Sequence, residues 1–309
     1  MNKKTVTVVG LGKIAIGYDL GVSDLWLTDQ TMTHTKAVLE SNNFELKYLV
    51  DNDLQVLTRV REKLPEVLCE TLDKVLELPA TNLVIISTPT SSHLEVVRAI
   101  SIKWSACDYL IEKPVGMDSS EANEIFDLLQ KSHNRVAVNY FRRFLPAYTE
   151  LKHLEIFRTR GALLSIFLDA YGSLANIFSH FFDLILFLEG SKALTLERKT
   201  LLLDQPNRKT FMMEDSGVLF DLDGIESDKK DCSLIIKYEM ITINISRDGS
   251  LIKIFDKNDV LIFSADIEPM LYAHYQSVVL NQIYSEYYSH DAHSRILDAI
   301  HIHKFIESI

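Results

Sequence analysis

The sequence predicts an α/β protein: a doubly wound parallel sheet with helices on both faces, followed by a second, α+β domain on a largely antiparallel open sheet. Three observations predict this fold class. Short apolar strands alternate with helices up to about residue 117, which is the rhythm of a parallel sheet. A glycine-rich turn at residues 10–17 follows the first strand directly. Longer strands and a hairpin turn then replace the alternation, so we expect domains at residues 1–117 and 118–309.

The first domain is expected to contain short strands, each a β-branched or apolar run. These strands are residues 5–9, 45–50, 67–69, 83–87 and 109–111. The helices between them are expected at residues 34–40, 54–64, 72–78 and 93–102. Residues 18–32 have mixed polarity and no clear period, which indicates a loop.

The second domain is expected to begin with a helix at residues 119–132, which Asp118 or Ser119 can cap. Its strands are expected at residues 136–140, 163–169, 233–238, 240–245 and 251–255. Two turns are expected between strands: the acidic stretch 222–231 and the hairpin signal 247–250. The closing helices are expected at residues 271–287 and 292–307.

Composition and charge narrow the class of protein. The 309 residues carry a net charge of -11, and both a nucleic acid and an anionic membrane require a basic face, so neither is an expected partner. The widely spaced Cys69, Cys107 and Cys232 form no CxxC pair, which argues against disulfides or bound metal and fits a reducing compartment. We find no signal peptide and no apolar run of transmembrane length. A cytoplasmic protein is therefore expected.

The turn after the first strand has the pattern G-x-G-x-x-A. It comprises Gly10, Gly12, Lys13, Ile14 and Ala15. In this pattern the first glycine makes the tight turn, the second lets a diphosphate approach the backbone, and the third position must be small for strand–helix packing. The diphosphate then sits on free N–H groups at the start of a helix. The sequence therefore predicts a Rossmann dinucleotide-binding domain.

An acidic residue is expected at the end of the second strand, and Asp51 stands there. Its carboxylate would accept hydrogen bonds from the adenosine ribose, and its charge would repel a 2′-phosphate. We therefore expect NAD as the cofactor, with NADP as the alternative. The spacing exceeds the usual ~20 residues, and the loop at 18–32 accounts for the excess. The other interpretation is a glycine turn that binds nothing, with Asp51 as a helix cap.

Several blocks of sequence, in the same order, resemble the Gfo/Idh/MocA family of oxidoreductases. They are GLGKIA (10–15), STPTSSH (87–93), EKPVG (112–116), NYFRRFLPAY (139–148), and SHFFD (179–183) with FLEG (187–190) after it. The resemblance is specific over residues 5–190. It implies a Rossmann domain and a mixed α/β domain whose open sheet often forms a dimer interface, hence a homodimer or homotetramer. It also implies hydride transfer on a sugar, nucleotide sugar, inositol or related polyol.

Polar residues lie just past two strand ends, where open α/β sheets bind ligands. The resemblance places them in the cofactor site: Thr88, Pro89, Thr90, His93, Glu112 and Lys113. Lys113 is held by Pro114, whose ring fixes the local backbone. A lysine there can donate to a substrate hydroxyl or share in proton transfer. From the residues alone, a solvated lysine near a turn is the alternative.

Oxidising an alcohol requires a group that takes the hydroxyl proton, and histidine is the usual choice. His180 lies in an otherwise apolar helix, where a lone histidine is often a hydrogen-bonded core residue. The resemblance favours a catalytic role. Asn176, on the same expected helical face, would bind substrate, but it stands where many family dehydrogenases have aspartate, and Phe178 replaces a family glycine. Asp183 matches the family's later aspartate and is either structural or a support for His180 at the substrate site.

Arg142 and Arg143 follow a strand and precede a proline. One of them would clamp an anionic substrate group such as a diphosphate; the alternative is a salt-bridged arginine between domains. Three functions remain open: an NAD(P)-dependent dehydrogenase or reductase, a non-catalytic dinucleotide-binding sensor or partner protein, and a lyase or epimerase that recycles its cofactor. Asn176 and Phe178 favour the second function.

Overall fold

The computed structural model describes residues 3–20, 30–130, 134–190, 194, 198–225, 231–268, 273–286 and 294–309. The chain forms two compact units. The first comprises Met1–Phe141 and Ala273–His303, and the second comprises Arg142–Tyr272 and Lys304–Ile309. The division falls later than the expected boundary at residue 117, because the next helix and strand continue the first sheet and a C-terminal segment returns to it.

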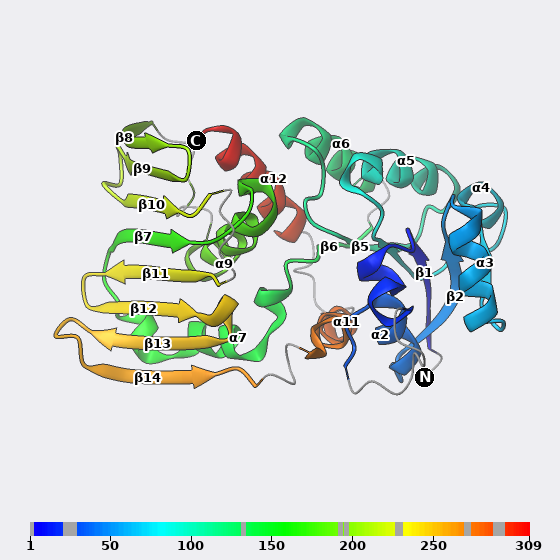
Figure 1. Cartoon of the computed structure of the whole chain (residues 1–309), viewed down its shortest axis with the longest axis horizontal. Helices are drawn as coiled ribbons and strands as arrows, with labels where there is room; N and C mark the ends of the chain where they lie inside the picture. The colour runs from blue at the N-terminus through cyan, green and yellow to red at the C-terminus, as the bar shows by residue number, and fades with distance from the viewer. Residues whose placement is uncertain are drawn as a thin grey trace. The chain divides into compact units, whose positions relative to one another are not determined.

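The first unit is built on a six-stranded sheet in which every neighbouring pair is parallel. Its strands, in sheet order, are β3 (Leu68–Glu70), β2 (Phe44–Val50), β1 (Lys4–Val9), β4 (Leu83–Ile86), β5 (Asp108–Ile111) and β6 (Val136–Val138) (Figure 1). This order, with its crossover beside β1, is that of a Rossmann sheet. The expected fold class of the N-terminal region is confirmed.

The apolar runs form these strands because they are buried on both faces. In β4 all four residues are buried, and Val6 and Val8 of β1 have no exposed surface. Such double burial removes the alternation of polar and apolar residues that a half-exposed strand shows. The continuous apolar runs at residues 5–9 and 83–87 therefore predict buried strands directly.

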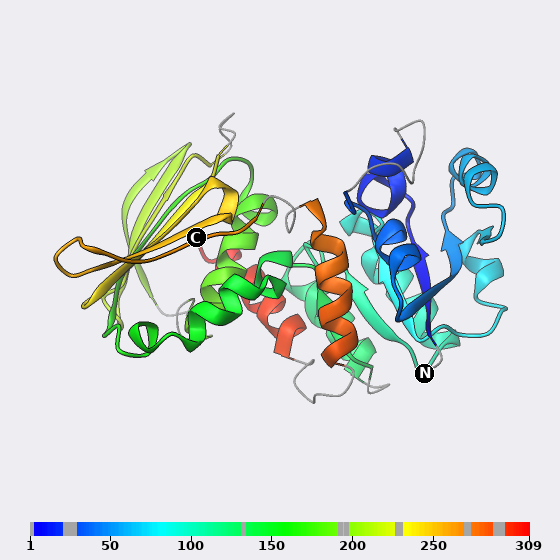
Figure 2. The same cartoon turned by 90° about the horizontal axis from the view of Figure 1, so that it is seen from below.

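Helices cover both faces of this sheet (Figures 1 and 2). They are α1 (Tyr18–Leu20), α2 (His34–Glu40), α3 (Leu54–Lys63), α4 (Leu72–Val75), α5 (His93–Lys103), α6 (Ser119–Gln130) and α11 (Tyr275–Glu286). The returning helix α11 packs on α2, and α5 packs beside α6. Thr33 caps α2 by accepting from the Lys36 amide, and Asp53 caps α3.

Part of the segment expected as a loop is helical. A π-helical turn at Lys13–Gly17 runs directly into α1, so the prediction of a loop from residue 18 was wrong for residues 18–20. Residues 21–29 of that expected loop lie outside the described residues. Helix α4 is shorter than expected, and β6 ends before Asn139.

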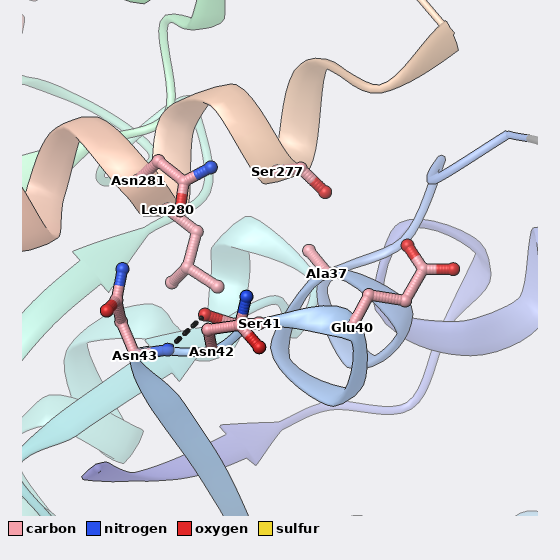
Figure 3. Close-up of a pocket in the computed structure, with 8 residues that line it drawn as sticks. All are labelled: Ala37, Glu40, Ser41, Asn42, Asn43, Ser277, Leu280 and Asn281. Atoms are coloured by element: carbon pink, nitrogen blue, oxygen red, sulfur yellow. Dashed lines mark hydrogen bonds between the residues drawn. The ribbon is translucent and has the colours of Figure 1, made fainter. Parts of the chain in front are cut away.

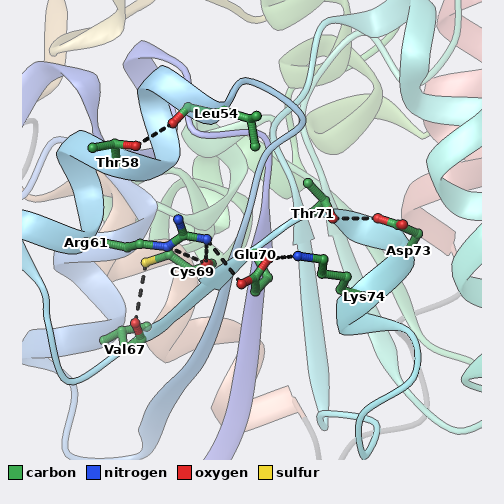
Figure 4. Close-up of polar contacts among 9 residues, drawn as sticks. All are labelled: Leu54, Thr58, Arg61, Val67, Cys69, Glu70, Thr71, Asp73 and Lys74. Carbon is green, nitrogen blue, oxygen red and sulfur yellow. Dashed lines mark hydrogen bonds and ion pairs between the residues drawn. The ribbon is translucent and has the colours of Figure 1, made fainter.

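Polar contacts fix the edge of the sheet around β3 (Figure 4). Arg61 of α3 donates from Nε (2.9 Å) and Nη2 (2.6 Å) to the carbonyl of Cys69. Its Nη2 also lies 3.2 Å from Glu70, whose other oxygen accepts from Lys74 at 3.2 Å. These bonds hold a three-residue strand that buries little apolar surface of its own.

The second unit is built on an eight-stranded sheet (Figure 1). In sheet order the strands are β14 (Leu261–Asp266), β13 (Leu251–Asp256), β12 (Ile241–Ser246), β11 (Ser233–Tyr238), β7 (Leu163–Asp169), β10 (Leu219–Asp223), β9 (Arg208–Met213) and β8 (Lys199–Gln205). Only the β7–β10 pair is parallel. The expectation of a largely antiparallel sheet is confirmed.

Four of these strands were not anticipated: β8, β9, β10 and β14. Strands β8 and β14 stand at the sheet's edges and are mostly exposed, so they lack a buried apolar run. Strand β10 overlaps the start of the acidic stretch expected as a turn, of which residues 226–230 lie outside the described residues. The hairpin turn at Arg247–Gly249 is confirmed, with Asp248 in the left-handed region at φ 54°.

An aromatic cluster forms the centre of the second unit's core. Phe305 makes an edge contact with Phe182 of α9 at 5.2 Å between ring centroids, and it also meets Phe211 and Phe220. The other helices here are α7 (Pro146–His153), α8 (Glu155–Arg158), α9 (Ser179–Glu189) and the end of α12 (Ser294–Glu307). Among the described residues, no helix is both long and apolar enough to cross a bilayer.

Candidate functional site

Gly10 makes the tight turn after β1, and the chain itself requires a glycine there. Its φ of +85° lies in the left-handed region. A Cβ at this position would also stand 2.6 Å from the backbone nitrogen of Thr88. Gly10 therefore lets the loops after β1 and β4 lie against each other.

Gly12 differs from Gly10 because nothing in the chain requires a glycine there. Its φ is −70°, and a Cβ would have no atom within 4 Å. Gly12 is exposed and precedes the helical turn at Lys13–Gly17, whose first amides have no partner within the helix. The absence of a side chain at Gly12 would let a diphosphate approach these amides closely, as its binding to the backbone requires. Ala15, fully buried, occupies the small third position.

Asp51 connects the end of β2 to the glycine turn. One carboxylate oxygen accepts from the backbone amide of Leu11 at 2.7 Å, and the other accepts from the amide of Asp53 at 2.9 Å. The side chain is half-buried. Besides its predicted ribose contact, Asp51 thus shapes the turn that would hold the diphosphate, a role that sequence reasoning did not identify.

The end of β4 is held by two buried polar side chains. Ser87 Oγ lies 3.1 Å and 2.9 Å from the carbonyls of Val9 and Gly10. The ring of His93 is fully buried between the carbonyls of Thr88 (3.0 Å) and Val115 (3.2 Å). Burial lowers the pKa of His93 against the effect of these carbonyls, so the neutral ring donates to one of them. Its geometry favours holding the two loops over touching a cofactor.

Glu112 and Lys113 follow β5, and Lys113 precedes a cis Pro114. Oε1 of Glu112 accepts from Nε2 of His34 at 2.8 Å and from Nδ2 of Asn139 at 2.6 Å. Burial raises the pKa of the Glu112 carboxyl, but these two donors and the nearby Lys113 charge outweigh it, and the pKa lies below its ordinary value. Glu112 is therefore ionised at neutral pH. Lys113 is half-buried.

Sequence reasoning missed His34 and Gln276 as parts of this region. His34 is the first residue of α2, and Gln276 lies in α11, more than 130 residues beyond Asn139. Neither residue carries a local motif. The sequence shows only that these two polar residues stand next to apolar runs. Their burial, which the fold provides, is what marks them as part of this region.

In the second unit, His180 is half-buried near the start of α9. Asn176 does not belong to that helix. It is exposed and lies in the preceding π-helical turn, Leu174–Phe178. A π turn has more residues per turn than an α-helix, so the regular four-residue spacing that placed Asn176 and His180 on one face does not apply.

Arg143 and Asp183 form a buried pair within the second unit. Nε of Arg143 donates to one oxygen of Asp183 at 2.8 Å, and Nη2 donates to the other. Their side chains are 6% and 0% exposed. The bidentate geometry uses the guanidinium fork and the whole carboxylate. This geometry fits the alternative interpretation of both residues as structural, and their substrate contacts stay a prediction.

Arg142 is also turned to an internal partner. Its Nε and Nη2 donate to the carbonyl of Asp248 at 3.0 and 2.7 Å, and its guanidinium lies over the ring of Phe181. Tyr148 donates to the next carbonyl, that of Gly249, at 2.6 Å. Together they hold the hairpin turn between β12 and β13, which is why the predicted anion clamp gains no support.

A cavity of about 240 Å³ lies in the first unit between α2 and α11 (Figure 3). It is lined by Ala37, Glu40, Ser41, Asn42, Asn43, Ser277, Leu280 and Asn281. None of the predicted site residues borders it. Across the described ranges, no group of three histidine, cysteine, aspartate or glutamate side chains is placed to hold a metal.

The comparisons with known proteins agree with this geometry. Residues 4–140 match the family model described as the oxidoreductase family with an NAD-binding Rossmann fold, GFO_IDH_MocA. The N-terminal region of the chain, residues 4–140, is thus similar to the Gfo/Idh/MocA family, whose model describes an NAD-binding Rossmann fold. A UDP-N-acetylglucosamine 3-dehydrogenase from Acidithiobacillus ferrooxidans is 28% identical over 148 residues, 43% of this chain and 44% of that protein. The matched segments span 22% to 44% of the curated relatives' lengths.

Solved structures share the fold over nearly the whole chain. A 3-ketoreductase from Actinomadura kijaniata, crystallised with TDP-benzene and NADP, has a TM-score of 0.74 and 13% identity, covering 100% of this chain and 97% of that one. The super-repressor mutant of Gal80p from Saccharomyces cerevisiae has a TM-score of 0.75 and 14% identity, covering 99% and 95%. At these identities the likeness establishes the fold.

Proposed function

We propose that this protein is an NAD(P)-dependent oxidoreductase that transfers a hydride to or from a carbon of a sugar, nucleotide sugar or related polyol. The single observation that carries the proposal is Gly12: a glycine required neither by its backbone nor by its neighbours, at the place where a diphosphate would need the room. The neighbouring Asp51 and the family match support NAD as the cofactor. The named activities of the UDP-N-acetylglucosamine 3-dehydrogenase and the 3-ketoreductase support the substrate class.

When bound, the nicotinamide supplies the hydride acceptor or donor. The chain's own task is to move the hydroxyl proton. Lys113 is proposed for this role, because it follows a strand end beside the ionised Glu112, and His180 is proposed as the second proton-transfer group, with Asn176 as a substrate ligand. Lys113 belongs to the first unit and His180 to the second, and each role is a separate part of the proposal. A homo-oligomeric state and cytoplasmic localisation stay predictions.

The first experiment tests the cofactor site by Gly12→Ala. The substitution adds a methyl group in open space, so the melting temperature should stay within about 2 °C of the wild type while NADH affinity falls at least ~10-fold. Fluorescence titration of NADH measures the affinity. Unchanged NADH affinity would remove the diphosphate site from the proposal.

A second variant tests the preference for NAD. Asp51→Asn removes the charge but keeps an oxygen for the Leu11 amide, which Asp51→Arg would not. NADPH affinity should rise toward that of NADH, because the repulsion of a 2′-phosphate is gone. If the ratio of NADH affinity to NADPH affinity were the same in the wild type and the variant, the role given to Asp51 would be contradicted.

Measuring turnover distinguishes an oxidoreductase from a non-catalytic dinucleotide-binding protein. The assay follows NADH absorbance with free sugars, inositols and nucleotide sugars, UDP-N-acetylglucosamine among them. Lys113→Met should keep NADH binding and lower turnover by about 10²–10⁴-fold. Tight NADH binding with no turnover on any of these would favour a non-catalytic sensor or partner protein. That alternative draws on Asn176, exposed and without a carboxylate, and on the shared fold of Gal80p.

A further inference from the structure

Glu112 is the meeting point of segments far apart in the sequence. Its backbone amide continues the sheet by donating to Ile86 at 2.9 Å. Its side chain, 13% exposed, contacts α2 through His34 and the end of β6 through Asn139. Both contacts are made by the same oxygen, Oε1.

Because the Glu112 carboxylate is the acceptor, both of its partners must be donors. An ionised carboxylate only accepts hydrogen bonds, so His34 must carry a proton on Nε2, and Asn139 must turn its amide nitrogen toward Glu112. The His34 side chain is 2% exposed, so water does not compete for this bond. The result is an anion whose orientation is set by two buried donors.

A second layer supports these donors from α11. Nδ2 of Asn139 also lies 3.3 Å from Oε1 of Gln276, which is 1% exposed. The ring centroids of Tyr275 and Phe141 are 4.9 Å apart. One residue earlier, Nδ1 of His274 is 2.8 Å from Oγ1 of Thr31, close before α2. The helices α2 and α11 are thereby tied to each other and to the end of β6.

We propose that His34 is a positioning residue for the hydride-transfer site, acting on Lys113 through Glu112. Glu112 and Lys113 are consecutive residues directly after β5, so the backbone that carries the held Glu112 side chain also carries Lys113. Fixing Oε1 therefore restrains the turn after β5, from which the Lys113 side chain extends. The inference rests on the proposed function, because Lys113 is the residue whose placement would matter for turnover.

A merely structural role makes a different prediction. A purely structural contact is expected to show mainly in the free energy of unfolding, because removing one partner of a buried pair leaves the other unpaired, whereas displacing a reacting group by about 1 Å can lower a rate by ~10²-fold. Positioning should therefore appear in turnover and in the order of the turn, more than in cofactor affinity.

The experiment compares His34→Leu and His34→Gln in the full-length protein. Leucine removes the donor, and the glutamine amide can reach Oε1 in its place. The matched control is Thr35→Val, the next residue on α2, whose buried Oγ1 has no hydrogen-bond partner within the described residues. For each we would measure NADH affinity, kcat and KM, and hydrogen exchange of the peptides covering residues 5–17 and 108–117 by mass spectrometry.

His34→Leu should lower kcat about 100-fold, leave the NADH Kd within ~3-fold, and speed exchange in the peptide 108–117 alone. His34→Gln and Thr35→Val should resemble the wild type. Any of three results would overturn the proposal. They are an equal loss of kcat in His34→Leu and His34→Gln, a loss of NADH affinity that parallels the loss of kcat, and unchanged hydrogen exchange in the peptide 108–117. If the wild type shows no turnover, the proposed function fails, and the exchange data still decide whether His34 orders the Lys113 turn.

Discussion

The two units use their buried charged side chains in opposite ways. In the first unit, Glu112 and Asp51 sit at strand ends, accept bonds from their own chain and keep part of their surface open. In the second unit, Arg143 and Asp183 satisfy each other and are closed to solvent. All four residues were candidate ligand contacts by sequence. The difference teaches that residue type and motif nominate a site, while the number of bonds already made inside the fold decides whether a ligand can use it.

The largest effect should come from breaking the closed pair of the second unit. Asp183→Ala leaves the Arg143 guanidinium buried without its carboxylate, which costs about 3–5 kcal/mol in the free energy of unfolding. Urea unfolding followed by circular dichroism measures it. The double variant Arg143→Met with Asp183→Leu should recover most of the loss. A stable Asp183→Ala protein that loses only substrate affinity would restore the binding role.

A smaller effect should separate the two glycines of the turn in the first unit. Gly10→Ala places a methyl group 2.6 Å from the Thr88 backbone at φ +85° and should destabilise the protein by about 1–3 kcal/mol. Gly12→Ala should be close to neutral in the same unfolding measurement. Equal destabilisation by both substitutions would mean that Gly12 is structural too, and the space in front of it would lose its significance.

The smallest effect concerns the three cysteine thiols, which are buried in both units. Burial raises the pKa of the Cys69 and Cys107 thiols to about 11 and that of Cys232 to about 12. Because a raised pKa keeps the reactive thiolate scarce until the pH approaches it, none of the three should be alkylated by iodoacetamide at pH 8 in the native protein. All three should react in urea. Fast labelling of one cysteine in the native state would show that its surroundings open, which intact-protein mass spectrometry would detect.

Much of the first unit could be predicted from sequence because its signals are local. The doubly buried strands at residues 5–9 and 83–87 are continuous apolar runs, and the glycine turn has a fixed spacing. The edge strands β8 and β14 could not be anticipated in the same way. They are mostly exposed and owe their existence to pairing with a neighbour.

The sequence by itself determined the class of sheet, the glycine turn with Asp51 behind it, and the placing of Lys113 after a strand, since each depends on residues close along the chain. Only the tertiary structure decided that Gly12 is free of its neighbours, that Arg143 and Asp183 neutralise each other, and that His34 meets Glu112. These facts depend on burial and on distances between residues up to 78 positions apart. Neither quantity exists until the chain has folded, because the low-dielectric surroundings that give a buried charge its energy are supplied by the rest of the molecule.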